Sequence, residues 1–243
     1  MMRRRIRIRT TAVLSTLLLT GAVTLLPAQP SAAAPEGTRD IRTQILKKAI
    51  IGVAQASQGV CDNDDNNPAV GRLLNRLTDR LTKITPARTE SEKLPEVAGG
   101  WKQVWSNLGG PSPVCNSAAD IYQVVSPNGY YWNFAKTLPP SGQPGYFFLR
   151  GKYETTPDFL SIEFTNQAIS PVAPPAGTNL AALSDRAESG EFIPLPPRPP
   201  VGVKGELKNV YVDDTLRIVR GTDNSGTTGP GTIFILVRAD VLS

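Results

Sequence analysis

From about Gly99 to the C-terminus, the sequence is a succession of short strand-forming segments separated by turn residues. The expected strands span residues 101–106, 119–125, 129–135, 145–154, 158–165, 205–212, 214–220 and 231–238. Within one of them, Leu160, Ile162 and Phe164 alternate with polar neighbours, which is typical of a strand with one buried face. Short strands joined by turns predict a mainly β fold. An antiparallel β-barrel fits them best, with a β-sandwich as the alternative.

A pair of amphipathic helices is expected before the strands. Residues 45–59 carry apolar side chains at helical spacing, and residues 67–85 carry a second apolar stripe. Asn67-Pro68 is a typical helix start, an N-cap residue followed by proline at the first helical position. The exposed side of the second helix is basic, with Arg72, Arg76, Arg80 and Lys83.

The N-terminal residues have the pattern of a secretory signal peptide. Five arginines lie within residues 3–9, an apolar run covers residues 12–26, and small residues offer a cleavage site after Ala32 or Ala33. The run is shorter than the about 20 apolar residues that a membrane-spanning helix needs. We therefore expect a signal peptide over 1–33, a helical segment over 34–98 and a barrel over 99–243. The mature protein is expected to be secreted or held in the cell envelope.

The basic charge of the chain belongs to this N-terminal segment. The full chain has 26 Lys and Arg against 21 Asp and Glu, and removing five arginines leaves 21 residues of each sign. Nucleic-acid binding requires an excess of Lys and Arg to contact phosphates. No nucleic-acid partner is therefore expected.

The absence of histidine excludes the common catalytic and metal-binding arrangements, including the Ser-His-Asp triad and His-ligated zinc. Asp213 and Asp214 are adjacent, so on a strand they would face opposite ways and could not flank one glycosidic bond. The acidic run 62–67 lacks the glycine and glutamate of a calcium-binding EF-hand loop. We expect no enzyme activity, no catalytic residue, no metal and no cofactor.

Two further features concern loops. The two cysteines, Cys61 and Cys115, would enter an oxidising compartment, where an even count favours one disulfide. Residues 171–200 contain eight prolines and predict a long loop that is mobile in part.

In its order of features the chain resembles the plastid lipid-associated proteins, also called fibrillins, which have a lipocalin-like barrel. The resemblance rests on the helical pair, the Trp-bearing strand at 100–106, residues 120–125 with the aromatic strand that follows, and residues 211–221. The last segment, YVDDTLRIVRG, is closely similar to the Y-x-D-x-x-L-R-I-x-R-G segment near the end of family members. The export signal, the cysteines and the proline-rich loop depart from the family. Taken with these departures, the resemblance implies a bacterial member of the family that has the same fold but is exported.

A small barrel can hold one apolar ligand, and one face of each strand lines its interior. The resemblance implies a lipid or another hydrophobic small molecule as that ligand. The candidate lining consists of aromatic residues: Trp101, Trp105, Tyr122, Tyr130, Trp132, Phe134, Phe148, Phe164 and Tyr211. Ordinary core packing is the alternative for each of them. The alternative function is a structural or interaction module that contacts lipid particles or the cell envelope, with the basic helix face against a lipid surface.

The closing segment contains two arginines with different expected roles. Arg217 and Arg220 are three residues apart, so they point to opposite faces of a strand. Lipocalins close the barrel base with a Trp–Arg stack, which implies that one of them lies against Trp101. The other would pair with Asp213 or Asp214. We expect these four charged residues to form a structural closing motif, with direct binding of a lipid carboxylate or phosphate by an arginine as the alternative.

Overall fold

The computed structural model describes residues 36–57, 68–107, 121–137, 145–170, 172–221 and 232–242. The predicted signal peptide, the acidic run 62–67 and both cysteines of the predicted disulfide lie outside these ranges. The helices are α1 (Glu36–Ala56), α2 (Pro68–Ile84), α3 (Glu90–Val97) and α4 (Leu180–Glu188). The strands are β1 (Gly99–Ser106), β2 (Ile121–Val125), β3 (Tyr130–Thr137), β4 (Gly145–Thr155), β5 (Leu160–Ser170), β6 (Ile193–Pro194), β7 (Lys204–Val212), β8 (Leu216–Gly221) and β9 (Ile233–Arg238).

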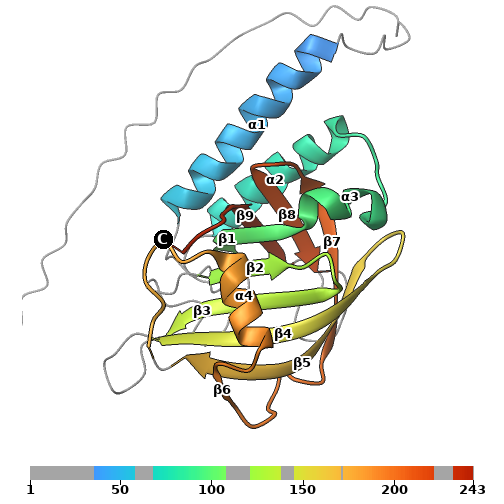
Figure 1. The fold of residues 1–243 in the computed structure, drawn as a ribbon. Coiled ribbons are helices and arrows are strands. Elements are labelled where there is room, and N and C mark those ends of the chain that lie inside the picture. The colour runs from blue at the N-terminus through green and yellow to red at the C-terminus, as the bar shows by residue number, and fades with distance from the viewer. Residues whose placement is uncertain are drawn as a thin grey trace, which may run out of the picture. The chain divides into compact units, whose positions relative to one another are not determined.

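The strands form a closed antiparallel barrel (Figure 1). Going around it, the order within the described residues is β4-β3-β2-β1-β9-β8-β7-β5, and β5 pairs with β4 to close the ring. β6 adds a short pairing to the edge of β5 that β7 leaves free. The expected mainly β, lipocalin-like barrel preceded by a helical pair is confirmed.

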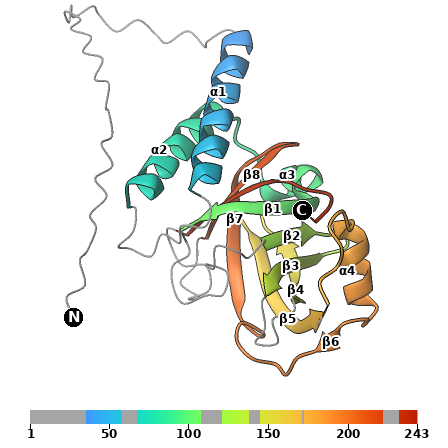
Figure 2. The same ribbon diagram turned by 90° about the vertical axis from the view of Figure 1, so that its left-hand side faces the viewer.

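The helical pair covers one outer side of the barrel, the side that carries β1, β8 and β9 (Figure 2). Ile50 of α1 and Leu74 and Leu81 of α2 are fully buried there, against outward-facing residues such as Trp105 and Ile235. α1 begins at Glu36, well before the expected start near residue 45, whereas α2 has nearly the expected bounds. The apolar stripe read from the sequence is thus the face that α2 packs on the sheet.

α4 covers a second outer side, over β2, β3 and β4. Asn179 is its N-cap, whose side chain accepts a hydrogen bond from the N–H of Ala182, and the helix buries Leu180 and Leu183. The prediction of a loop throughout residues 171–200 is therefore wrong for Leu180–Glu188 and for β6. Prolines flank α4 on both sides, and the segment between them is free to form a helix because it contains none.

α3 was not expected from the sequence, and it closes one end of the barrel. Thr89 and Glu92 form a capping box, in which each side chain accepts a hydrogen bond from the other residue's backbone N–H. α3 lies next to the start of β1 and contacts β7. Its buried residues, Glu90, Lys93 and Val97, face the inside of the barrel end.

Candidate functional site

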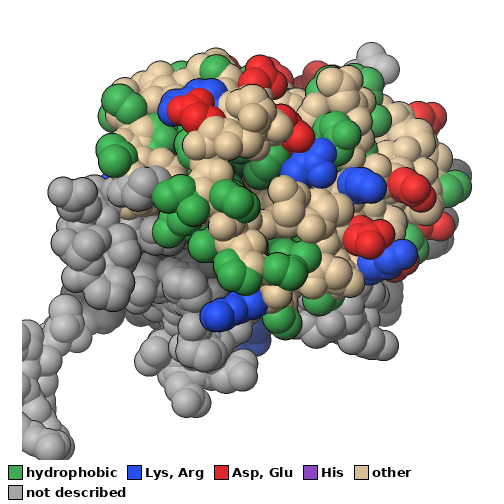
Figure 3. Space-filling view, turned by 60° about the horizontal axis from the view of Figure 1, so that its bottom comes forward, with side chains coloured by type: hydrophobic (Ala, Val, Ile, Leu, Met, Phe, Trp, Pro, Cys, Tyr) green, Lys and Arg blue, Asp and Glu red, His purple; other side chains and the backbone are tan. Residues whose placement is uncertain are grey.

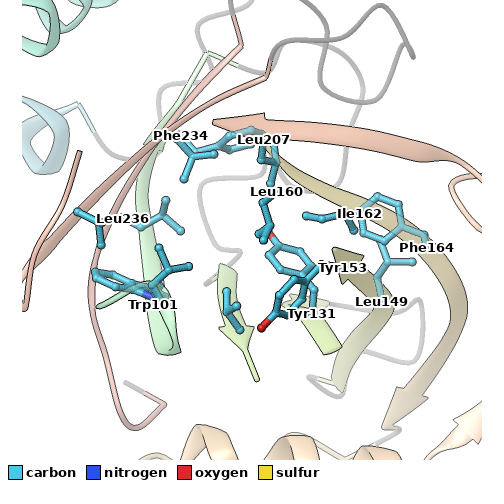
Figure 4. Close-up of a cluster of buried hydrophobic side chains, with 14 residues drawn as sticks. Trp101, Tyr131, Leu149, Tyr153, Leu160, Ile162, Phe164, Leu207, Phe234 and Leu236 are labelled. Atoms are coloured by element: carbon cyan, nitrogen blue, oxygen red, sulfur yellow. The ribbon is translucent and has the colours of Figure 1, made fainter. Parts of the chain in front are cut away.

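The barrel interior contains a cluster of buried apolar side chains, here called the inner cluster (Figure 4). Its members come from α3 and from all eight strands of the ring as far as they are described: Val97, Trp101, Val125, Tyr131, Leu149, Tyr153, Leu160, Ile162, Phe164, Leu207, Val212, Val219, Phe234 and Leu236. In Figure 4 these side chains point toward one another from the surrounding strands. The inner cluster is distinct from the apolar clusters that lie under α1 and α2 and under α4.

Trp101 and Arg238 close the barrel at the α3 end. The Trp101 ring is fully buried, and its Nε1 donates to the carbonyl of Val97 at 2.8 Å. The guanidinium carbon of Arg238 lies 3.8 Å from the centre of that ring, and Arg238 also donates to the carbonyls of Ala98 and Glu96. The expected Trp–Arg stack is therefore present. Arg238 supplies it, and neither arginine of the closing segment does so.

Arg217 is buried inside the barrel, with no exposed surface. Its Nε donates to Oδ1 of Asn209 at 2.6 Å, and its Nη1 donates to Oε1 of Gln123 at 3.2 Å. Nη2 has no hydrogen-bond partner among the described residues. Arg217 therefore has a fixed orientation and one free donor nitrogen in the interior.

A buried ion pair on α3 holds Asn209, the hydrogen-bond partner of Arg217, at the closed end of the barrel. Glu90 accepts hydrogen bonds from the N–H and the side-chain amide of Asn209, and from Nζ of Lys93 at 2.9 Å. Lys93 also donates to the carbonyl of Asn209 at 2.6 Å. Asn209 is thus held from both sides, by α3 and by Arg217, and α3 is fastened to β7.

Burial controls the titration of two of these interior groups. It lowers the pKa of Arg217, although an arginine stays protonated in proteins. Burial also raises the pKa of Tyr131 to about 12, against the opposing effects of Arg217 and of a hydrogen bond with Asn133. At neutral pH the interior therefore holds a charged Arg217 beside a neutral Tyr131 hydroxyl.

The inner wall is more accessible at the end of the barrel remote from α3. Ala135, Phe147 and Ile169 are neighbours in the register of β3, β4 and β5, and Phe147 packs on the inner cluster. All three are half-buried rather than buried. They lie at the ends of their strands opposite to Tyr131 and Tyr153. Three apolar residues on the inward face of the sheet therefore keep part of their surface exposed at this end of the barrel.

The structure corrects most of the predicted aromatic lining. Of the nine candidates, Trp101 and Phe164 belong to the inner cluster. Tyr122, Trp132, Phe134 and Phe148 face outward under α4, Trp105 and Tyr211 face outward under the helical pair, and Tyr130 lies outside against Arg150. Tyr130, Trp132 and Phe134 alternate along β3 and share its outer face.

The closing motif has a structural role with different partners from those expected. Asp213 lies in the β7–β8 turn, where it pairs with Lys47 of α1 and accepts from the Tyr211 hydroxyl at 2.7 Å. Arg220 points outward and pairs with Asp79 of α2 at 2.7 Å. Asp214 is exposed in the same turn. The opposite orientation of Arg217 and Arg220 is confirmed, but neither arginine pairs with Asp213 or Asp214 among the described residues.

Sequence reasoning missed Gln123 and Asn209 as partners of Arg217, and Glu90 as the residue that holds Asn209. These residues are far apart in the sequence, and no pattern in the sequence indicates that they are in contact. A period-2 reading of β2 and β3 does contain one clue, because the faces with Gln123 and Asn133 are the more polar ones.

Comparison with known proteins gives no identification. No family model, no curated protein and no solved structure matches the chain. The fold and the interior geometry therefore carry the functional argument.

Three further observations concern the surface charge, membrane-spanning helices and metal-binding groups. On the face shown in Figure 3, acidic and basic side chains are interspersed with hydrophobic ones, and neither sign of charge gathers into a patch. No helix in the described ranges is long and apolar enough to cross a membrane. The same residues contain no group of three or more Cys, Asp or Glu arranged to hold a metal ion.

Proposed function

We propose that the mature chain is a secreted binding protein, without enzymatic activity, that holds a lipid or another hydrophobic small molecule inside its barrel. The observation that carries the proposal is that Ala135, Phe147 and Ile169, on the inward face of a closed ring of strands, are half-buried rather than buried. Eight strands leave an interior that side chains fill or that accommodates one small ligand. The apolar outer sides of the barrel are covered by α1, α2 and α4, so their aromatic residues are accounted for by packing.

Two sequence features extend this proposal. The export signal favours a secreted or envelope-bound protein, and the segment over residues 211–221 favours a relative of the fibrillins. In the structure this segment forms the hairpin of β7 and β8, which places Arg217 inside the barrel and Arg220 against α2.

The test uses secreted mature protein and N-phenylnaphthylamine, an uncharged fluorophore that becomes bright in apolar surroundings. We expect saturable enhancement with about one site per chain, and a lipid in solvent extracts of the purified protein by mass spectrometry. Phe147→Glu places a charge on the accessible inner wall and should weaken binding at least tenfold. Phe159→Glu is the matched control, because Phe159 is also half-buried but lies outside the inner cluster, beside Lys208. Absence of saturable binding, together with protein free of lipid, would contradict the proposal.

A second candidate is attachment to a lipid surface through the helical pair. Ile41 and Ile45 of α1 are 64% and 61% exposed, and the basic residues of α2 are exposed as well. Sedimentation with phosphatidylglycerol vesicles tests it, with phosphatidylcholine vesicles as the comparison. Binding to the anionic vesicles that is lost in Ile41→Glu/Ile45→Glu would support attachment, and no sedimentation with either would refute it.

A further inference from the structure

The free donor of Arg217 is the starting point. Nη2 is buried and has no hydrogen-bond partner in the described parts of the chain, while Nε and Nη1 are both engaged. Native proteins satisfy nearly all of their buried polar groups, so an unfilled charged donor needs an explanation. An arginine nitrogen is a pure donor, and what it lacks is an acceptor.

The charge balance specifies the kind of acceptor. Glu90 and Lys93 form an ion pair, so their charges cancel, and both residues are almost fully buried. Arg217 forms no ion pair with any carboxylate of the described residues, and its neutral partners are the amides of Asn209 and Gln123. The Glu90 carboxylate also acts electrostatically on Arg217, so among the described residues the buried group of Arg217, Lys93 and Glu90 keeps one net positive charge, which one negative charge would balance.

The position of Arg217 specifies the shape of the ligand. Arg217 lies at the beginning of β8, paired with Val212 and Leu236 next to the β7–β8 turn, close to the α3 end. Farther along the same strands the inner wall is apolar, with Val219 and Phe234, and the accessible surface around Phe147 lies at the far end. An anion at Arg217 would thus be the deep end of a molecule whose apolar part extends toward the accessible end.

We propose that the ligand of the barrel is an apolar monocarboxylic acid, such as a fatty acid, whose carboxylate binds Nη2 of Arg217. This inference rests on the proposed function and specifies the class of ligand. A carboxylate carries one negative charge, which matches the single uncompensated charge, whereas a phosphate monoester carries close to two at neutral pH. Tyr131, a neutral hydroxyl that interacts electrostatically with Arg217, offers a second donor in the same region.

The test compares laurate, methyl laurate and dodecyl phosphate as competitors that displace N-phenylnaphthylamine from the wild-type protein. The three probes have alkyl chains of nearly equal length and differ in head group. We expect laurate to bind about 10- to 100-fold more tightly than methyl laurate, as a charge-assisted hydrogen bond in a buried site would provide. Dodecyl phosphate should bind more weakly than laurate, because its second charge has no partner.

Variants of Arg217 assign the effect to this residue. Arg217→Met should abolish the preference for laurate over its ester, and Arg217→Lys should retain part of it, because lysine keeps the charge. Arg220→Met is the matched control: it removes an arginine of the same strand that points outward to α2, and should keep the full preference. If Arg217→Met does not fold, the acid and ester comparison on the wild-type protein still decides the question.

The outcomes separate the two proposals. Equal affinities for laurate and methyl laurate, a preference that persists in folded Arg217→Met, or tighter binding of dodecyl phosphate would each overturn the carboxylate inference and leave the binding function standing. Failure of the uncharged fluorophore to bind, together with no binding of the three alkyl compounds when each is titrated directly by calorimetry, would overturn both.

Discussion

At the scale of single residues, Asp213 makes the most consequential polar contact outside the barrel interior. Burial raises its pKa, but hydrogen bonds from Lys47, Tyr211 and the N–H groups of Thr215 and Leu216 outweigh this and lower the pKa from 3.8 to about 2. Lys47 is itself almost fully buried, with a side chain 8% exposed. Asp213 therefore joins α1 to the β7–β8 turn and compensates a buried ammonium group.

The first prediction concerns Asp213→Asn. A lowered pKa in the folded state contributes stability that is present above pH of about 4 and is lost as the pH falls toward about 2. Because Asp213 is half-buried, we expect this contribution to be about 1–2 kcal/mol, and Asp213→Asn to lower the free energy of unfolding at pH 7 by that amount or somewhat more. The difference between wild type and variant should shrink between pH 4 and pH 2.

Urea unfolding as a function of pH measures this effect. Asp214→Asn is the control, since Asp214 is exposed in the same turn and its substitution should change stability by less than about 0.5 kcal/mol. Equal stability of the two variants at pH 7 would contradict the role given to Asp213.

The second prediction contrasts two glycines. A Cβ at Gly100 would lie 2.2 Å from the carbonyl oxygen of Ala239 and 2.8 Å from Cδ1 of Leu180, so Gly100→Ala should destabilise the protein by about 2 kcal/mol or more. A Cβ at Gly52 on α1 meets no atom within 4 Å, so Gly52→Ala should stabilise it by about 0.5–1 kcal/mol. Thermal unfolding compares them. A Gly100→Ala protein as stable as Gly52→Ala would show that β1 does not approach the C-terminal segment this closely.

At the scale of elements, α4 explains why the aromatic strands were assigned to the wrong side. In β3 and β4 the outward face is aromatic, with Trp132 and Phe148, because α4 covers it. The inward face of β3 reads Tyr131, Asn133 and Ala135, which is less apolar. Period-2 alternation identifies the residues that share a face of a strand. It does not indicate which of the two faces points into the barrel.

Other elements were easier or harder to predict for related reasons. Most strands were located closely because turn residues bound them, and α2 because its apolar stripe is regular. β5 differs, since it runs to Ser170, beyond the expected end at residue 165. α3 was missed because Pro95 lies inside a helix of only eight residues. Arg217 was placed on the correct strand, but its partners could not be foreseen, since they come from β2 and β7, and Asn209 is in turn held by Glu90 of α3.

The third prediction tests the covering role of α4. Leu183 of α4 is fully buried between this helix and the barrel, so Leu183→Ala should lower the free energy of unfolding by about 2–4 kcal/mol. Asp185→Ala, an exposed position of the same helix, should have little effect on stability. Folded Leu183→Ala should bind N-phenylnaphthylamine with unchanged affinity, because the cluster under α4 is separate from the interior. A tenfold loss of affinity would instead place the ligand under α4.

At the scale of the whole molecule, the barrel is apolar on both faces of its sheet. α1, α2 and α4 cover outer sides of the barrel, α3 closes one end, and the inside combines the inner cluster with a charged group at its closed end. Aromatic residues on the outer sides of the barrel therefore have a different role from those in its interior. Those on the outside hold helices on the barrel, and the ligand that we propose, with one apolar and one anionic end, would occupy the interior.

The three tryptophans provide the most direct test of this account, because they sample the three apolar regions. Trp101 belongs to the inner cluster, Trp105 lies under α1 and α2, and Trp132 lies under α4. Single-tryptophan proteins made by Trp→Phe substitution at the other two positions, each checked for folding by circular dichroism, are titrated with dibrominated stearate, whose bromines quench nearby indole fluorescence. The account predicts strong, saturable quenching of the protein that retains Trp101 and little quenching of the other two. Stronger quenching of Trp105 or Trp132 than of Trp101, or no saturable quenching of any of them, would contradict binding inside the barrel.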